Sequence, residues 1–206
     1  ESEKEYYNYI NEWAINVERA VALGTTIRML SPVLAESFVN LIILILSRDD
    51  FKKDARLYEN LIRQQIDVRV KTLHLNCIGF SKSINSEDKE FKNFQTLMNN
   101  RNDFLHGNID PIRLMFEDVY FDKKNIPLFE EDNGIIYRTM NNYLKNVEPE
   151  KAVGDFITVQ KFIGFILSHI NKEEQRHIIE LLLTRMPAVN RRTNEISILF
   201  PQELVQ

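Results

Sequence analysis

The most hydrophobic run in the chain is VLAESFVNLIILIL, residues 33–46, and the predicted fold is built around it. A helix built from it is apolar on nearly every side, which is typical of a helix at the centre of a bundle. The run is too short to span a bilayer comfortably, which takes about 20 residues, and it carries Glu36 and Asn40. We therefore predict a buried core helix over about 32–47 and expect no contact with a membrane.

Helix-forming sequence lies on both sides of this run. Ile10 and Trp13 belong to an apolar pattern at helical spacing that predicts a first helix over about 3–29. Ser31 and Pro32 then form a start signal for the core helix, as N-cap and first helical residue. Further helices are predicted over about 54–78, 87–106, 149–170 and 172–185.

The stretch 109–146 has a different character. Its short aromatic and β-branched runs, cut by Pro127 and the Asn-Gly pair at 133–134, predict a loop with a small hairpin. A strand is predicted at 195–200. The low glycine and proline content predicts an all-α fold, a helical bundle of about five to six helices with this insert. We expect a single domain over 1–206. Its parts are a core bundle at 1–107, late helices at 149–186, the insert at 109–146 and a tail at 187–206.

Composition excludes several classes of site. Apolar residues make up 44% and charged residues 27%, ordinary values for a soluble globular protein. The net charge of −4 argues against a broad nucleic-acid-binding surface but leaves room for a local basic cluster. The single cysteine, Cys77, excludes an internal disulfide and a cysteine-based zinc site, and its apolar neighbours predict a buried thiol. No signal-peptide pattern opens the sequence, so we expect a cytoplasmic protein.

Two Arg–His pairs share one spacing: Arg69 and His74 in RVKTLH, and Arg101 and His106 in RNDFLHGN. Five residues of helix advance roughly 7.5 Å and turn about 140°, so neither pair lies side by side on one helix. Their contexts differ. Apolar neighbours make His74 a predicted core or boundary residue. His106 ends a predicted helix beside a glycine, where a side chain can reach a cleft.

A helix end alone also explains RNDFLHG. Gly107 is suited to the position after the last helical residue, where a positive φ is common. Basic side chains such as Arg101 and His106 in the last turn interact favourably with the helix dipole. The residues alone therefore leave both interpretations open, a helix terminus and a functional site.

RNDFLHG resembles the signature of the HEPN superfamily, whose ribonuclease members carry an Arg, usually then a polar Asn or Asp, and a His a few residues later. The matching residues here are Arg101, Asn102 and His106. A looser likeness covers roughly 30–107, where a helical bundle with an apolar central helix carries the motif near the end of a long helix. The insert at 109–146 has no counterpart that we can name.

The resemblance implies a metal-independent endoribonuclease without cofactors, working as a homodimer whose two motifs form a composite active site. His106 would act as acid or base, because histidine titrates near neutral pH. Arg101 would stabilise charge on the phosphate. Asn102 would orient His106 or bind the phosphate. Attack by the RNA 2′-hydroxyl would leave a 2′,3′-cyclic phosphate and a 5′-hydroxyl.

The same resemblance implies an RNA substrate and a toxin or defence effector kept in check by an inhibitory or regulatory protein partner. An alternative stays open, a non-catalytic helical module of the same fold for dimerisation and partner binding, because fold does not set function. His169 and His177 share roughly one face of the late helices, but no carboxylate pattern accompanies them and no metal site is predicted.

Overall fold

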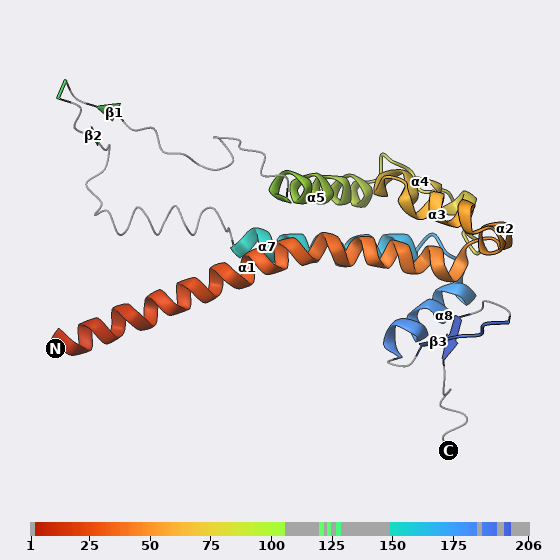
Figure 1. The fold of residues 1–206 in the computed structure, drawn as a ribbon, viewed down its shortest axis with the longest axis horizontal. Coiled ribbons are helices and arrows are strands. Elements are labelled where there is room, and N and C mark those ends of the chain that lie inside the picture. The colour runs from red at the N-terminus through yellow and green to blue at the C-terminus, as the bar shows by residue number, and fades with distance from the viewer. Residues whose placement is uncertain are drawn as a thin grey trace, which may run out of the picture. The chain divides into compact units, whose positions relative to one another are not determined.

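The computed structural model describes residues 3–105, 120–121, 123–124, 127–128, 149–184, 187–192 and 196–198. Within this part of the chain there are seven helices and four strands of two or three residues each. The predicted all-α fold class is therefore confirmed (Figure 1). The helices are α1 (Glu3–Leu46), α2 (Asp49–Lys53), α3 (Ala55–Arg63), α4 (Ile66–Asn76), α5 (Lys89–Leu105), α7 (Pro149–Leu167) and α8 (Lys172–Leu183).

The short strands form two antiparallel pairs. β1 (Tyr120–Phe121) pairs with β2 (Pro127–Leu128), so the small hairpin predicted within the insert is present. The Asn-Gly pair at 133–134 lies outside the described residues. β3 (Pro187–Val189) pairs with β4 (Ile196–Ile198), which confirms the predicted strand in the tail.

The chain divides into two compact units. Unit 1 consists of Glu1–Ser31 and Met98–Ile157, and unit 2 consists of Pro32–Leu97 and Thr158–Gln206. Helices α1, α5 and α7 each contribute residues to both units. The single domain over the whole chain stays a prediction.

The core of unit 2 is built around the second half of α1, as the sequence predicted. This segment contributes several fully buried apolar residues, and its polar Glu36 and Asn40 contact α4. Five further helices, α3, α4, α5, α7 and α8, also contribute buried side chains to unit 2, and removing apolar surface from water is the main favourable term in folding. The buried residues of this core include Ala35, Phe38, Val39, Ile42, Ile43, Leu46, Leu61, Val70, Leu73, Phe91, Phe94, Val159, Phe162, Ile166, Ile178 and Leu181.

α1 is the one helix in the described part of the chain that is long and apolar enough to cross a membrane by length and composition. Half of its most apolar 18-residue window is buried inside the structure. Core helices of soluble proteins can have the same length and hydropathy as membrane-spanning helices. These two properties of α1 therefore do not distinguish a protein core from a membrane.

α1 is continuous where two helices were predicted. Pro32 lies inside it, although an interior proline removes one backbone hydrogen bond and costs about 3 kcal/mol. Ser31 and Pro32 are both buried. The start signal at Ser31 does not begin a new helix. Burial of Ser31, Pro32 and the apolar residues from Ala35 onward favours the continuous helix against the local cost of the proline.

The prediction of one helix over about 54–78 is wrong, because the structure has two helices there, α3 and α4. The backbone leaves the helical region at Gln64, with ψ of 156°, and at Gln65, with ψ of 141°. The Asp54 carboxylate caps α3 by accepting two backbone N–H groups of its first turn. Neither glycine nor proline marks the break, so the sequence pattern contains no signal for it.

A short segment after α4 ties together distant parts of unit 2. Cys77 bridges to the residue after α1, and the Ile78 N–H donates to the Leu46 carbonyl at 2.7 Å. Phe80 forms a second antiparallel bridge with Ile170, between α7 and α8. Burial raises the pKa of the Cys77 thiol to about 12, which agrees with the predicted inert, buried cysteine.

Gly79 allows this segment to turn, and replacing it should destabilise the protein. Its φ is +81°, a conformation that side chains disfavour, and an added Cβ would lie 2.7 Å from Cγ of Glu174. We expect Gly79→Ala to lower the free energy of unfolding by about 1–3 kcal/mol. Gly164→Ala is the matched control, because an added Cβ in α7 meets nothing within 4 Å.

The control substitution should stabilise α7 by about 0.5–1 kcal/mol, since alanine has the higher helix propensity. Denaturant unfolding of both variants beside the wild type measures the two changes. Equal stability of the Gly79→Ala and Gly164→Ala proteins would contradict the requirement for glycine at Gly79.

Candidate functional site

The described residues of the candidate site, Arg101 and Asn102, lie on α5. Phe91, Phe94 and Met98 recur at three or four residues and are buried. Arg101 follows Met98 by three residues and therefore continues the same face. It is half-buried, whereas Asn102, one residue further round the helix, is exposed. The helix thus holds the arginine at the edge of a packed surface and leaves the asparagine accessible to a ligand.

Of the three predicted site residues, the structure describes Arg101 and Asn102 but not His106. Arg101 and Asn102 occupy the last part of α5, which the structure gives up to Leu105. His106, and with it Gly107, lies outside the described residues. The approach of His106 to Arg101, and the composite site formed by two copies, stay predictions.

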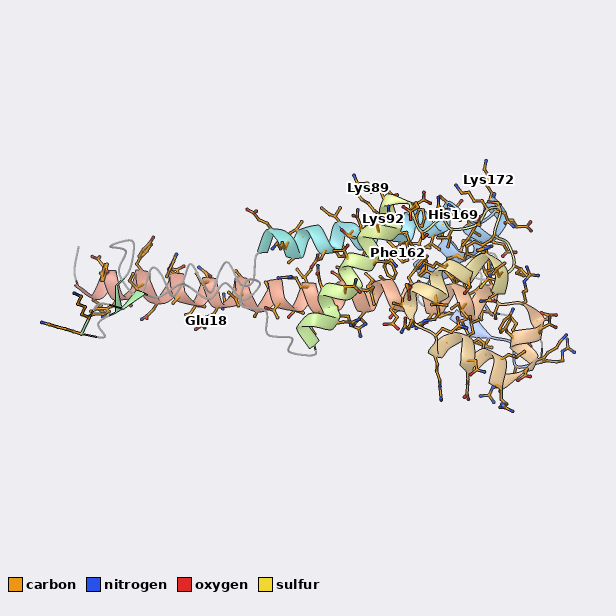
Figure 2. All side chains as sticks on the ribbon, turned by 90° about the horizontal axis from the view of Figure 1, so that it is seen from above. Glu18, Lys89, Lys92, Phe162, His169 and Lys172 are labelled. Carbon is orange, nitrogen blue, oxygen red and sulfur yellow. The ribbon has the colours of Figure 1, made fainter. Side chains whose placement is uncertain are left out.

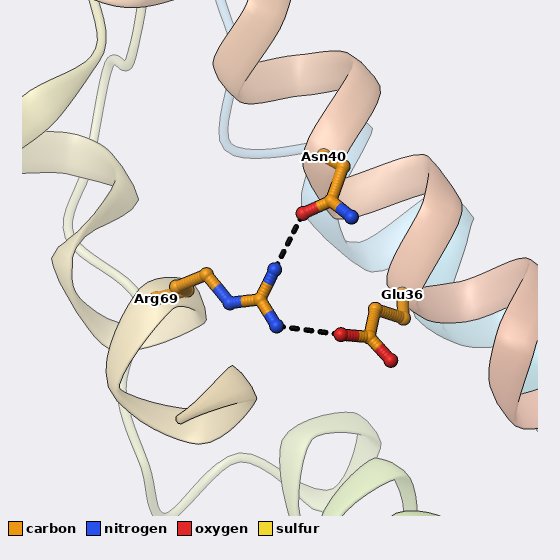
Figure 3. Close-up of polar contacts among 3 residues, drawn as sticks. All are labelled: Glu36, Asn40 and Arg69. Carbon is orange, nitrogen blue, oxygen red and sulfur yellow. Dashed lines mark hydrogen bonds and ion pairs between the residues drawn. The ribbon is translucent and has the colours of Figure 1, made fainter. Parts of the chain in front are cut away.

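In the other Arg–His pair, Arg69 and His74, the arginine has a structural role. Arg69 on α4 is 5% exposed, and its guanidinium reaches two side chains of α1 (Figure 3). Nη1 donates to Oδ1 of Asn40 at 2.5 Å, and Nη2 donates to Oε1 of Glu36 at 2.6 Å. The charge of Arg69 is therefore used in pairing two helices of unit 2.

This network was not predicted, although the sequence contains a partial signal for it. Glu36 and Asn40 are four residues apart, so they lie on one side of an otherwise apolar helix. Polar groups on a buried helix need hydrogen-bond partners, and together these two call for a donor from another element. Nothing local indicates that Arg69, 33 positions after Glu36, is that donor.

His74 lies as predicted, at the boundary of the core. It is half-buried on α4, and its Nδ1 atom is buried without a hydrogen-bond partner in the described part of the chain. The Arg69 guanidinium is engaged by Glu36 and Asn40, which distinguishes this arginine from the half-buried Arg101.

The two histidines of the late helices each have a backbone partner. His169 is 4% exposed, and its Nδ1 lies 2.8 Å from the Phe165 carbonyl, to which it donates. His177 places Nε2 3.2 Å from the Ile196 carbonyl of β4. Among the described residues, no group of three or more His, Cys, Asp or Glu side chains is placed to hold a metal ion.

An open pocket of about 400 Å³ lies in unit 2, between residues of α5 and residues at the end of α7. The two helices contact each other through the rings of Phe94 and Phe162, which stack with centroids 4.0 Å apart. Figure 2 labels Lys89 on α5 and Phe162 on α7. The pocket is lined by Lys89, Glu90, Asn93, Lys161, Phe165 and Ser168.

This pocket was not predicted from the sequence. Its two lysines come from helices that a long insert separates, and only the packing of α5 on α7 brings them to one cavity. Comparison of the chain with protein-family models, with curated proteins and with solved structures gives no match.

Proposed function

We propose that the chain is a metal-independent endoribonuclease that uses Arg101, Asn102 and His106. The observation that carries the proposal is the contrast between the two Arg–His pairs. Arg69 is 5% exposed, whereas Arg101 is half-buried near the end of α5, beside the exposed Asn102. An arginine at the edge of a packed surface is held in position and can still contact a phosphate.

The chemistry suits these residue types. RNA carries its own nucleophile, the 2′-hydroxyl. A base removes its proton as the oxygen attacks phosphorus, and the bond to the 5′ oxygen breaks as an acid protonates that leaving group. His106 serves as one of these groups, and His106 of a second copy serves as the other. Arg101 binds the phosphate oxygens on which charge accumulates in the transition state.

A second candidate is a non-catalytic module for dimerisation and protein binding. It is favoured by the first turns of α1, where large apolar and aromatic side chains are exposed together. Exposed patches of this kind mark interaction surfaces. The side chains are Tyr6, Tyr7, Tyr9, Ile10 and Trp13. In the ribonuclease proposal the same surface would suit the inhibitory or regulatory partner of a toxin or defence effector.

Cleavage of RNA in the presence of EDTA tests the proposed activity. The purified protein is expected to cut single-stranded RNA with the chelator present and to leave 2′,3′-cyclic phosphate and 5′-hydroxyl ends, because the 2′-hydroxyl is the nucleophile. Mass spectrometry of the fragments identifies these ends. Cleavage that depends on added Mg²⁺, or 3′-hydroxyl products, would contradict the mechanism. Inert folded protein on varied RNAs would favour the interaction module.

A further inference from the structure

The pocket between α5 and α7 contains two cationic side chains with no partner of their own. Lys89 and Lys161 are exposed, and neither forms an ion pair or hydrogen bond in the described part of the chain. By contrast, Lys92 nearby is paired with Glu87 at 2.6 Å. Two unpaired ammonium groups lining one cavity provide positive charge for an anionic ligand, and phosphate is the anion that lysines commonly bind.

The same pocket has an aromatic wall that is held in place. Phe165 is half-buried, and its ring contacts the buried His169 ring edge-on, with centroids 4.5 Å apart. His169 also donates to the Phe165 carbonyl, so the two residues are joined at both backbone and ring. A ring fixed in this way loses little freedom when a flat ligand stacks on it.

The remaining polar groups suit the edge of a base. Asn93 is exposed and offers both a donor and an acceptor. The Ser168 hydroxyl donates to the Phe165 carbonyl at 2.7 Å, and its oxygen, 3.4 Å from Nδ1 of His169, has a further lone pair that can accept. Glu90 is the one carboxylate of the lining, so the two ammonium groups are in excess. Its oxygens can accept from the exocyclic amino group of a base, as carboxylates do in nucleic-acid recognition.

We propose that this pocket binds one nucleotide of a single-stranded RNA, with phosphates at Lys89 and Lys161 and the base stacked on Phe165. A volume of about 400 Å³ lies within the usual range of small-ligand sites. The inference rests on the proposed function, because it takes RNA as the substrate. It adds a second contact on α5, whose far end carries Arg101.

Binding of a fluorescently labelled single-stranded RNA to the His106→Ala protein tests this assignment without cleavage. Fluorescence anisotropy in EDTA at several salt concentrations gives the affinity and its salt dependence. Replacing both lysines, Lys89→Gln with Lys161→Gln, is expected to weaken binding about tenfold and to reduce the salt slope by about 0.7 per lysine. Lys53→Gln, an exposed lysine of α2 outside the pocket, should leave both quantities unchanged.

The aromatic contact has its own variants. Phe165→Leu is expected to weaken binding about tenfold with little change in the salt slope, because it removes stacking and no charge. Phe165→Tyr should restore binding. Thermal unfolding of each variant checks that the helices remain packed, and restoration by tyrosine separates stacking from general damage to the fold.

Three results would overturn the proposal. In the first, the double lysine variant binds RNA with the same affinity and salt slope as Lys53→Gln. In the second, AMP displaces the RNA at comparable concentration, which would make the pocket a site for free nucleotides. In the third, the protein binds no RNA. The outcome of the cleavage assay is separate: cleavage with pocket-independent binding overturns only the pocket, and pocket-dependent binding without cleavage overturns only the nuclease.

Discussion

Alanine at Arg101 or at His106 is expected to lower the rate of RNA cleavage by about a hundredfold or more. Loss of His106 removes the group that transfers protons, an effect of about 10²–10⁴ in rate. Loss of Arg101 removes the cation that stabilises charge on the phosphate, with a comparable effect. Single-turnover cleavage of a labelled RNA in EDTA measures both. Arg101→Lys should retain part of the activity, since lysine keeps the charge but not the bidentate geometry.

His74→Ala is the matched control for this experiment. His74 has the same sequence relation to Arg69 that His106 has to Arg101, but it lies half-buried on α4 in unit 2. We expect this variant to cut RNA at the wild-type rate. If Arg101→Ala and His106→Ala remain fully active while folded, RNDFLHG is a helix end and the catalytic assignment is wrong. If His74→Ala is the inactive variant, RVKTLH contains the catalytic histidine and the assignment to RNDFLHG is wrong.

Replacing Arg69 with methionine is expected to lower the free energy of unfolding by about 3 kcal/mol. The substitution keeps much of the side-chain volume but leaves Glu36 and Asn40 without the donor that pairs them with α4. Most of the loss is the cost of a carboxylate that remains in a partly buried position without its cation. Denaturant unfolding followed by circular dichroism measures the change.

Two further variants separate charge pairing from packing. Arg63→Met removes an arginine of α3 that is 78% exposed and pairs with Glu59 at 3.6 Å, so it should change stability by less than about 0.5 kcal/mol. Combining Arg69→Met with Glu36→Leu and Asn40→Leu should recover most of the lost stability, because no polar group of the network then stays unpaired. A triple variant as unstable as Arg69→Met alone would show that the network contributes mainly through packing.

The fold class and the central segment of the core could be predicted from the amino-acid sequence alone. The all-α fold follows from helical spacing and low glycine and proline content, and the central place of 33–46 in the core follows from its hydrophobicity, although Val33, Leu34 and Leu44 are exposed. These are local properties, since a short window of sequence contains the periodicity that produces them. The helical pattern over 87–106 likewise predicted the place of Arg101 and Asn102 in the last part of α5, whereas His106 lies outside the described residues.

Contacts between residues far apart in the chain depend on how the helices pack. The continuity of α1 through Pro32 depends on whether burial offsets a local cost, and burial is a property of the packed unit. Arg69 contacts Glu36 because α4 packs on α1, and Lys89 and Lys161 line one pocket because α5 packs on α7. Such pairings depend on contacts between helices far apart in the chain, so no local pattern in the sequence specifies them.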